Sequence, residues 1–168
     1  VLDISGGASL KSSLSVDEYG IADLDVVIYR DGLLEYSEYI PSMVPSLKVR
    51  LMEDCEYDIY VVANAGDMPA FAREFDFQEN CLYAIDEISD LQERLPMAWN
   101  CSGIKVVDGM EAIDVQLERL AAKITFSLDK NVLEGLNVTS VRLCQCASAV
   151  RPFKDTDAMG SRAVGVEE

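Results

Sequence analysis

The sequence predicts a mainly β protein, a β-sandwich of about seven antiparallel strands with two short helices in the connections. Short segments in which apolar and polar residues alternate recur along the chain, and turn signals such as Asp31-Gly32 and Asp108-Gly109 follow two of them. Helical signals occur in only two places. With 168 residues and 49% hydrophobic residues, the chain is long enough for one domain with a core.

The N-terminal third contains a short strand and a hairpin. Leu2 and Ile4 alternate with polar residues, which predicts a strand at the start of the chain. Residues 24–28 and 33–36 are predicted to pair as a hairpin, because Asp31-Gly32 between them suits a turn with two positive φ angles.

Two further strands are predicted before the first helix. Leu47, Val49 and Leu51 alternate with Lys48, Arg50 and Met52, which is typical of a half-exposed strand. Residues 57–63 are apolar on both faces and predict a central strand.

The two helices are predicted from capping residues. Asp67 can cap a first helix with Pro69 in its first turn, and Asn80 can cap a second over residues 82–91. The acidic residues of the second helix are interpreted as a solvated face, since they lack the spacing of a calcium loop. They are Asp86, Glu87, Asp90 and Glu93.

The second half returns to strands. Residues 95–99 and 104–107 are predicted to be extended, and residues 113–128 carry the longest β signal. Within that segment the apolar residues change from odd to even positions, which predicts a β-bulge or bend at Glu118-Arg119.

A final strand is expected over Val138–Val150, so the folded domain is predicted to span residues 1–150. After Arg151-Pro152 the periodicity is lost, and residues 151–168 are predicted to be a linker or tail.

Composition argues against several kinds of chemistry. Fourteen basic and thirty acidic residues give a net charge of −16, which disfavours nucleic acid and anionic lipid as partners. The chain has no histidine, so Ser-His and Cys-His nucleophile pairs are excluded. No run of apolar residues is long enough to span a bilayer. We therefore expect no catalytic residues, no cofactor and no metal site, although paired carboxylates leave an enzyme as a minor alternative.

Five cysteines without a CxxC pair argue against structural zinc. We expect them mainly as small buried residues, with one disulfide as the alternative.

The segment "YDIYVVANAGDMPAFAREF" raises the question of a phosphate site, because a strand, a glycine turn and a helix start follow one another at residues 57–75. A phosphate cradle needs several glycines and usually a Lys or Arg. Here one glycine is followed by Asp67, whose charge would repel phosphate, so an ordinary strand-to-helix connection is expected.

Three segments together resemble the N-terminal domain of Bacteroidales-type fimbrillins, the family of the major fimbrial subunit and the Mfa-like proteins. They are "YDIYVVANAG" at 57–66, "LPM" at 95–97 and "VQLERLAAKITFSLD" at 115–129, and the resemblance covers roughly residues 15–150. It implies a transthyretin-like Greek-key sandwich that is exported as an outer-membrane lipoprotein and built into surface fimbriae. It also implies a C-terminal domain beyond residues 151–168, and polymerisation by strand exchange with other fimbrial subunits.

The sheet edges are the predicted assembly site, since unpaired backbone groups recruit strands from other chains. We expect the partner-strand groove to involve Val1, Leu2, Ile4, Val138, Val141 and Leu143. On this hypothesis, deleting residues 1–4 impairs polymer formation and leaves a soluble domain. The alternative is a surface module that binds a host protein or a glycan without polymerising, with Trp99 and the tyrosines as an aromatic platform, although cross-strand pairing is the tyrosines' more common role.

Overall fold

The computed structural model describes residues 2–5, 20–84, 95–121, 139–154, 158–159 and 162–167. In these residues the chain forms thirteen strands and one helix. The elements are β1 (Leu2–Ser5), β2 (Leu24–Arg30), β3 (Leu33–Ile40), β4 (Ser46–Leu47), β5 (Glu56–Ala63), α1 (Glu74–Asn80), β6 (Tyr83–Ala84), β7 (Met97–Lys105), β8 (Ile113–Gln116), β9 (Glu118–Arg119), β10 (Ser140–Cys146), β11 (Ala149–Val150), β12 (Ala158–Met159) and β13 (Arg162–Glu167).

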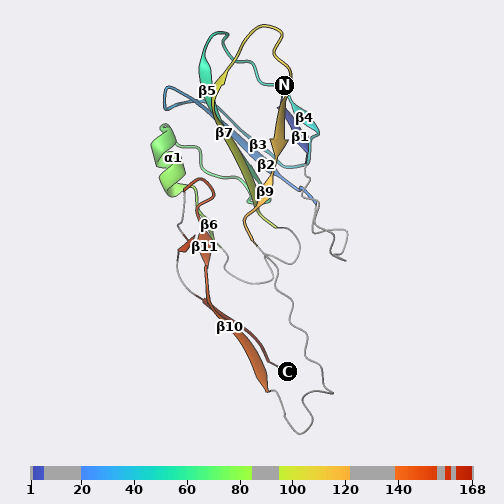
Figure 1. The fold of residues 1–168 in the computed structure, drawn as a ribbon, viewed down its shortest axis with the longest axis vertical. Helices are drawn as coiled ribbons and strands as arrows, with labels where there is room; N and C mark the ends of the chain where they lie inside the picture. Colours follow the sequence, from blue (N-terminus) through green and yellow to red (C-terminus); the bar gives the residue numbers. More distant parts are fainter. Residues whose placement is uncertain are drawn as a thin grey trace.

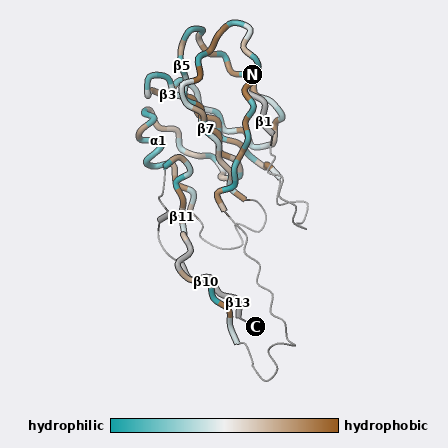
Figure 2. Tube along the Cα trace, in the orientation of Figure 1, coloured by the Kyte–Doolittle hydropathy of each residue, from teal (hydrophilic) through white to brown (hydrophobic). Residues whose placement is uncertain are grey.

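The largest sheet has five antiparallel strands in the order β3-β2-β5-β7-β9. Its β2–β3 hairpin is confirmed, and Asp31 and Gly32 have φ angles of 52° and 72° as this turn requires. The central strand is also confirmed, because β5 pairs with β2 on one side and β7 on the other. In Figure 2 a hydrophobic stretch runs through β5, in agreement with its burial, whereas β7 is buried only at Met97 and Ala98.

A second sheet, β4-β1-β8, completes a sandwich and so confirms the predicted fold class. The main core lies between the two sheets and includes Val26, Ile59 and Val61 of the large sheet, together with Val115 of β8. Figure 1 shows β1 and β4 on the opposite side of the large sheet from α1. The pairing of β1 with β8 is parallel, whereas β1 pairs with β4 in the antiparallel direction.

The predicted phase change near Glu118 marks a strand that changes sheets. Residues 113–116 pair with β1 in the small sheet, and residues 118–119 pair with β7 in the large sheet. Leu117, between them, is buried in the main core. Val115 and Leu117 are two residues apart and so lie on the same face of the strand, which lets both enter this core while the chain passes from the small sheet to the large one.

The outer face of the large sheet is covered by α1 and the loop that precedes it. A second core there contains Val27, Tyr29, Tyr60, Val62, Phe77 and Cys81. The predicted helix start at Asp67 is wrong, because α1 begins at Glu74 with Arg73 at its N-cap. Residue 68 precedes Pro69, which disfavours helical backbone at that position.

The second predicted helix start is also wrong. Asn80 is the last residue of α1, and Tyr83–Ala84 form strand β6. Residues 85–94, which hold the predicted acidic face, lie outside the described residues.

Two strand predictions need revision. The predicted strand at 47–51 is reduced to Ser46–Leu47, although Leu47, Val49 and Leu51 all pack against the main core as their alternation suggested. The extended segments predicted at 95–99 and 104–107 are joined by one continuous strand, β7, which includes residues 97–99 and 104–105 of them and leaves 95–96 and 106–107 outside.

The C-terminal elements form two small sheets, β12-β11-β6 and β10-β13. Figure 1 shows β10 at the far end of the molecule from β4 and β5, next to the C-terminal label. The segment 151–168, predicted to be a linker or tail, contains strands β12 and β13. Its role as a link to a further domain stays a prediction, and residues 122–138 lie outside the described residues.

Candidate functional site

The predicted groove residues fall into two separate sheets. Leu2 and Ile4 belong to β1, whereas Val141 and Leu143 belong to β10 and pair with Val166 and Val164 of β13. Val1 and Val138 lie outside the described residues. The structure therefore brings Leu2 and Ile4 together in one strand but does not place them in a common sheet with β10.

Strand β1 occupies the middle position of the sheet β4-β1-β8. Leu2 is in register with Leu47 of β4 and with Ile113 of β8, and Ile4 is in register with Val115. Val115 is fully buried, and Leu47 and Ile113 are half-buried against the main core. A four-residue strand next to the N-terminus thus fills a gap between two strands that already contact the core.

The loop after β5, in the segment considered as a phosphate site, binds aspartate side chains of this chain. Asp23 accepts hydrogen bonds from the amides of Ala65 and Gly66, both at 3.2 Å, and Asp25 accepts one from Met68 N at 3.3 Å. Aspartates that precede and begin β2 therefore fill the positions that phosphate oxygens would need. The loop holds its own anions, which agrees with the expectation of a structural connection.

Asn64, the first residue of this loop, connects three segments. Its amide donates to the carbonyl oxygens of Gly20 and Leu95, and its Oδ1 accepts from Ala22 N at 2.8 Å. Asn64 has a φ of 60° and is buried. The side chain therefore satisfies backbone groups of the chain entering β2 and of the chain entering β7.

Asp25 is a buried carboxyl group in an otherwise apolar strand, and only 4% of its surface is exposed. Burial raises its pKa to about 7, the amide of Met68 opposes that rise, and the charges of Asp67 and Asp23 add to it. Asp25 is not among the site residues predicted from the sequence. A single Asp between Leu24 and Val26 in a strand of apolar residues was the available signal.

The tyrosines act mainly as structural residues. Tyr29 and Tyr60, on adjacent strands, make an edge-to-face contact with ring centroids 5.9 Å apart, which confirms cross-strand pairing for these two. Their hydroxyls bond the chain around α1: Tyr29 donates to Phe71 O, and Tyr60 donates to Glu74. Buried rings of this kind cannot form a surface platform for a sugar.

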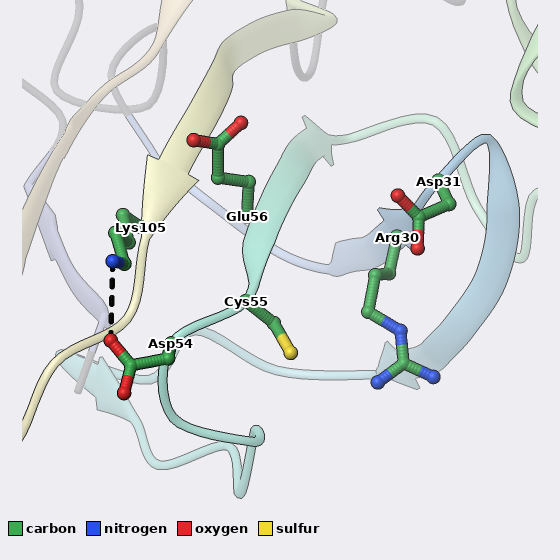
Figure 3. Close-up of a pocket in the computed structure, with 6 residues that line it drawn as sticks. All are labelled: Arg30, Asp31, Asp54, Cys55, Glu56 and Lys105. Carbon is green, nitrogen blue, oxygen red and sulfur yellow. Dashed lines mark ion pairs between the residues drawn. The ribbon is translucent and has the colours of Figure 1, made fainter.

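A hollow of about 330 Å³ lies beside the β2–β3 turn (Figure 3). It is lined by Arg30, Asp31, Asp54, Cys55, Glu56 and Lys105. Lys105 is 3.1 Å from Asp54, and Arg30 is 3.0 Å from Glu35, so both cations already have carboxylate partners. This arrangement offers an anionic ligand little net attraction.

Two of the described thiols adjoin features already named, since Cys55 lines the hollow and Cys81 packs in the second core. Cys55, Cys81, Cys101 and Cys144 are free, and of these four Cys81 is buried while Cys144 is exposed. The expectation of burial is thus confirmed for Cys81 and wrong for Cys144. Burial raises the pKa of the Cys81 thiol to about 12, so it is held in the unreactive protonated form.

Within the part of the chain that the structure describes, no group of three His, Cys, Asp or Glu residues is placed to hold a metal ion. The same residues contain no helix with the length and apolar character needed to cross a membrane.

Comparison with solved structures shows that another protein has a similar fold. A fimbrial assembly protein from Parabacteroides distasonis aligns with a TM-score of 0.60 and 16% sequence identity, over 94% of this chain and 73% of that chain. Neither protein-family models nor curated proteins gave a match. The chain therefore shares the fold of a fimbrial assembly protein.

Proposed function

We propose that this protein is a structural subunit of a cell-surface fimbria, without a catalytic centre, that joins other subunits by strand exchange. The likeness in fold to a fimbrial assembly protein supports the fimbrial role. The central place of β1 between β4 and β8 supports the mode of joining and is the observation that carries the proposal.

Strand exchange needs a position that one strand can leave and another can fill. If β1 left, the facing edges of β4 and β8 would expose backbone N–H and C=O groups at the spacing of one missing strand. Leu47 and Ile113, which flank the β1 position in register, are half-buried against the main core. An incoming strand would regain both the main-chain hydrogen bonds and the apolar contacts.

Because β1 lies between β4 and β8, its removal has a different expected effect on assembly. The sequence alone predicts that deletion of residues 1–4 impairs assembly. In the sandwich, deletion of residues 1–5 should instead open a groove that accepts a strand supplied by another molecule.

The test compares the full chain with a variant lacking residues 1–5. A labelled peptide with the sequence of residues 1–8, VLDISGGA, should bind the truncated chain saturably and compete poorly for the full chain. A matched peptide with Leu2→Asp and Ile4→Asp should bind at least about tenfold more weakly, because charged residues would then face Ile113 and Val115 in register. A folded truncated chain that binds neither peptide would count against strand exchange.

We further propose that the subunit is exported and held at the outer membrane as a lipoprotein, as the resemblance to fimbrillins implies. Isolation of native fimbriae with this chain among their subunits would support that location. Recovery of the chain only from the cytoplasm would contradict it.

A further inference from the structure

Three aspartates gather around loop 64–68 at one end of the large sheet. Asp23 and Asp25 accept hydrogen bonds from amides of this loop, and Asp67 belongs to the loop itself. The charges of Asp23 and Asp67 both act on Asp25. One end of the sheet therefore concentrates three carboxyl groups around one buried position.

Other elements enclose Asp25 as well. Tyr39 of β3 and Val62 of β5 are its cross-strand neighbours in the large sheet. Cys81, directly after α1, is close enough for Asp25 to raise the pKa of its thiol. Among the described residues, the titratable groups that act on Asp25 or are acted on by it are thus Asp23, Asp67, Tyr39 and Cys81, and each of these is neutral or negative.

We propose that Asp25 is a protonation-dependent latch for loop 64–68: the neutral carboxyl group holds the loop on the sheet, and the ionised group loosens it. This inference does not depend on the proposed fimbrial function.

The surroundings of Asp25 stabilise its neutral form better than its ionised form. A neutral carboxyl group can still accept the hydrogen bond from Met68 N and carries no charge into the buried site. An ionised one keeps that bond but meets the charges of Asp23 and Asp67 in a poorly hydrated position. Opening of the loop would hydrate the carboxylate and move Asp67 away from it.

The direction of the pH dependence follows from the pKa values in the two states. Asp25 has a pKa of about 7 with the loop closed, and a hydrated aspartate titrates near ~4. Opening is therefore least favourable below about pH 4, becomes easier as pH rises towards 7, and levels off above that. Between pH 5 and pH 8 the opening equilibrium should shift by about tenfold to a hundredfold.

A loosened loop would affect more than its own residues. Asn64, at the start of the loop, holds Gly20 and Ala22 before β2 and Leu95 before β7. Ionisation of Asp25 should therefore increase the exchange of Ala22 N as well as that of the loop amides.

Hydrogen exchange of the whole chain, measured by NMR at pH 5 and pH 8 and corrected for intrinsic rates, tests the latch. Protection of the amides of Ala65, Gly66 and Met68 should fall by about tenfold or more at pH 8. In Asp25→Asn this fall should disappear. In Asp108→Asn, which removes an equal charge from an exposed turn, it should persist.

Two outcomes would overturn the latch. One is equal protection of the loop amides at both pH values in the unmodified chain. The other is a midpoint near ~4 for the Asp25 carboxyl resonance, since an ordinary carboxyl group is already ionised at pH 5. Neither result would bear on peptide binding by the truncated chain.

Discussion

Replacement of Asn64 tests how much of the fold depends on one polar side chain. Asn64→Ala removes three hydrogen bonds, to Gly20 O, Ala22 N and Leu95 O. At roughly 1 kcal/mol each, their loss costs about 3 kcal/mol, because the abandoned backbone groups are partly buried. Alanine must also adopt the φ of 60° found at this position, which adds about 1 kcal/mol.

The two contributions can be separated with a glycine variant. Asn64→Gly loses the same hydrogen bonds but accepts a positive φ, so it should be less destabilising than Asn64→Ala by roughly 0.5–1 kcal/mol. Asn100→Ala makes the same side-chain change at an exposed position of β7 and should cost less than about 0.5 kcal/mol. This control shows what truncation of an asparagine costs without the hydrogen bonds.

Urea unfolding, followed by circular dichroism, measures these free energies of unfolding from the midpoint and slope. We expect losses of about 4 kcal/mol for Asn64→Ala and about 3 kcal/mol for Asn64→Gly, with slopes unchanged. A loss below about 1 kcal/mol for Asn64→Ala would refute the idea that this residue joins the entries of β2 and β7. A glycine variant no better than alanine would refute the backbone part of the argument.

Three further predictions concern the cores, the titration of Asp25 and the hairpin turn. Phe77→Ala should lower the free energy of unfolding by about 3–5 kcal/mol, since the ring is fully buried among Tyr29, Tyr60 and Phe153. Phe75 is 68% exposed, so Phe75→Ala should lower it by less than about 1 kcal/mol in the same urea experiment. Because the pKa of Asp25 is raised to about 7 in the folded state, this group should lower the free energy of unfolding by about 2–3 kcal/mol more at pH 8 than at pH 5. Urea unfolding of Asp25→Asn at the two pH values should not show this difference. Gly32→Val should cost more than about 1 kcal/mol and lower the melting temperature, because φ is 72° there and a β-branched residue is strained at that angle.

Local sequence was sufficient where one physical rule dominates an element. The β2–β3 hairpin followed from the turn preference of Asp31-Gly32, and the central place of β5 followed from apolar residues on both faces. The phase change predicted at Glu118-Arg119 lies where the chain passes from one sheet to the other, although most of the residues after the change lie outside the described residues and alternation cannot tell a bulge within one sheet from a strand that crosses between sheets. The crossing depends on which core lies beneath Val115 and Leu117.

The two helix starts failed for different reasons. Asn80 ends α1, and its side chain donates to Asp76 O in the preceding turn. Asp67 had the residue type of an N-cap, but Pro69 has no N–H for it to bind, and the amide of Met68 is held by a tertiary contact with Asp25, which is 43 residues away in sequence. The same competition hid the role of Asn64, whose three partners come from segments 31 to 44 residues distant. No local pattern contains those partners, so a single sequence cannot indicate them.

The places where local rules are broken are also the places on which the two proposals rest. A buried carboxyl group in an apolar strand costs stability, and the parallel pairing of β1 with β8 is slightly less stable per residue than antiparallel pairing. A fold selected only for stability would have an apolar residue in place of Asp25 and an antiparallel neighbour for β1 in place of β8. Their presence is expected if the loop and the strand must move, because segments that open are drawn from the least stable parts of a protein.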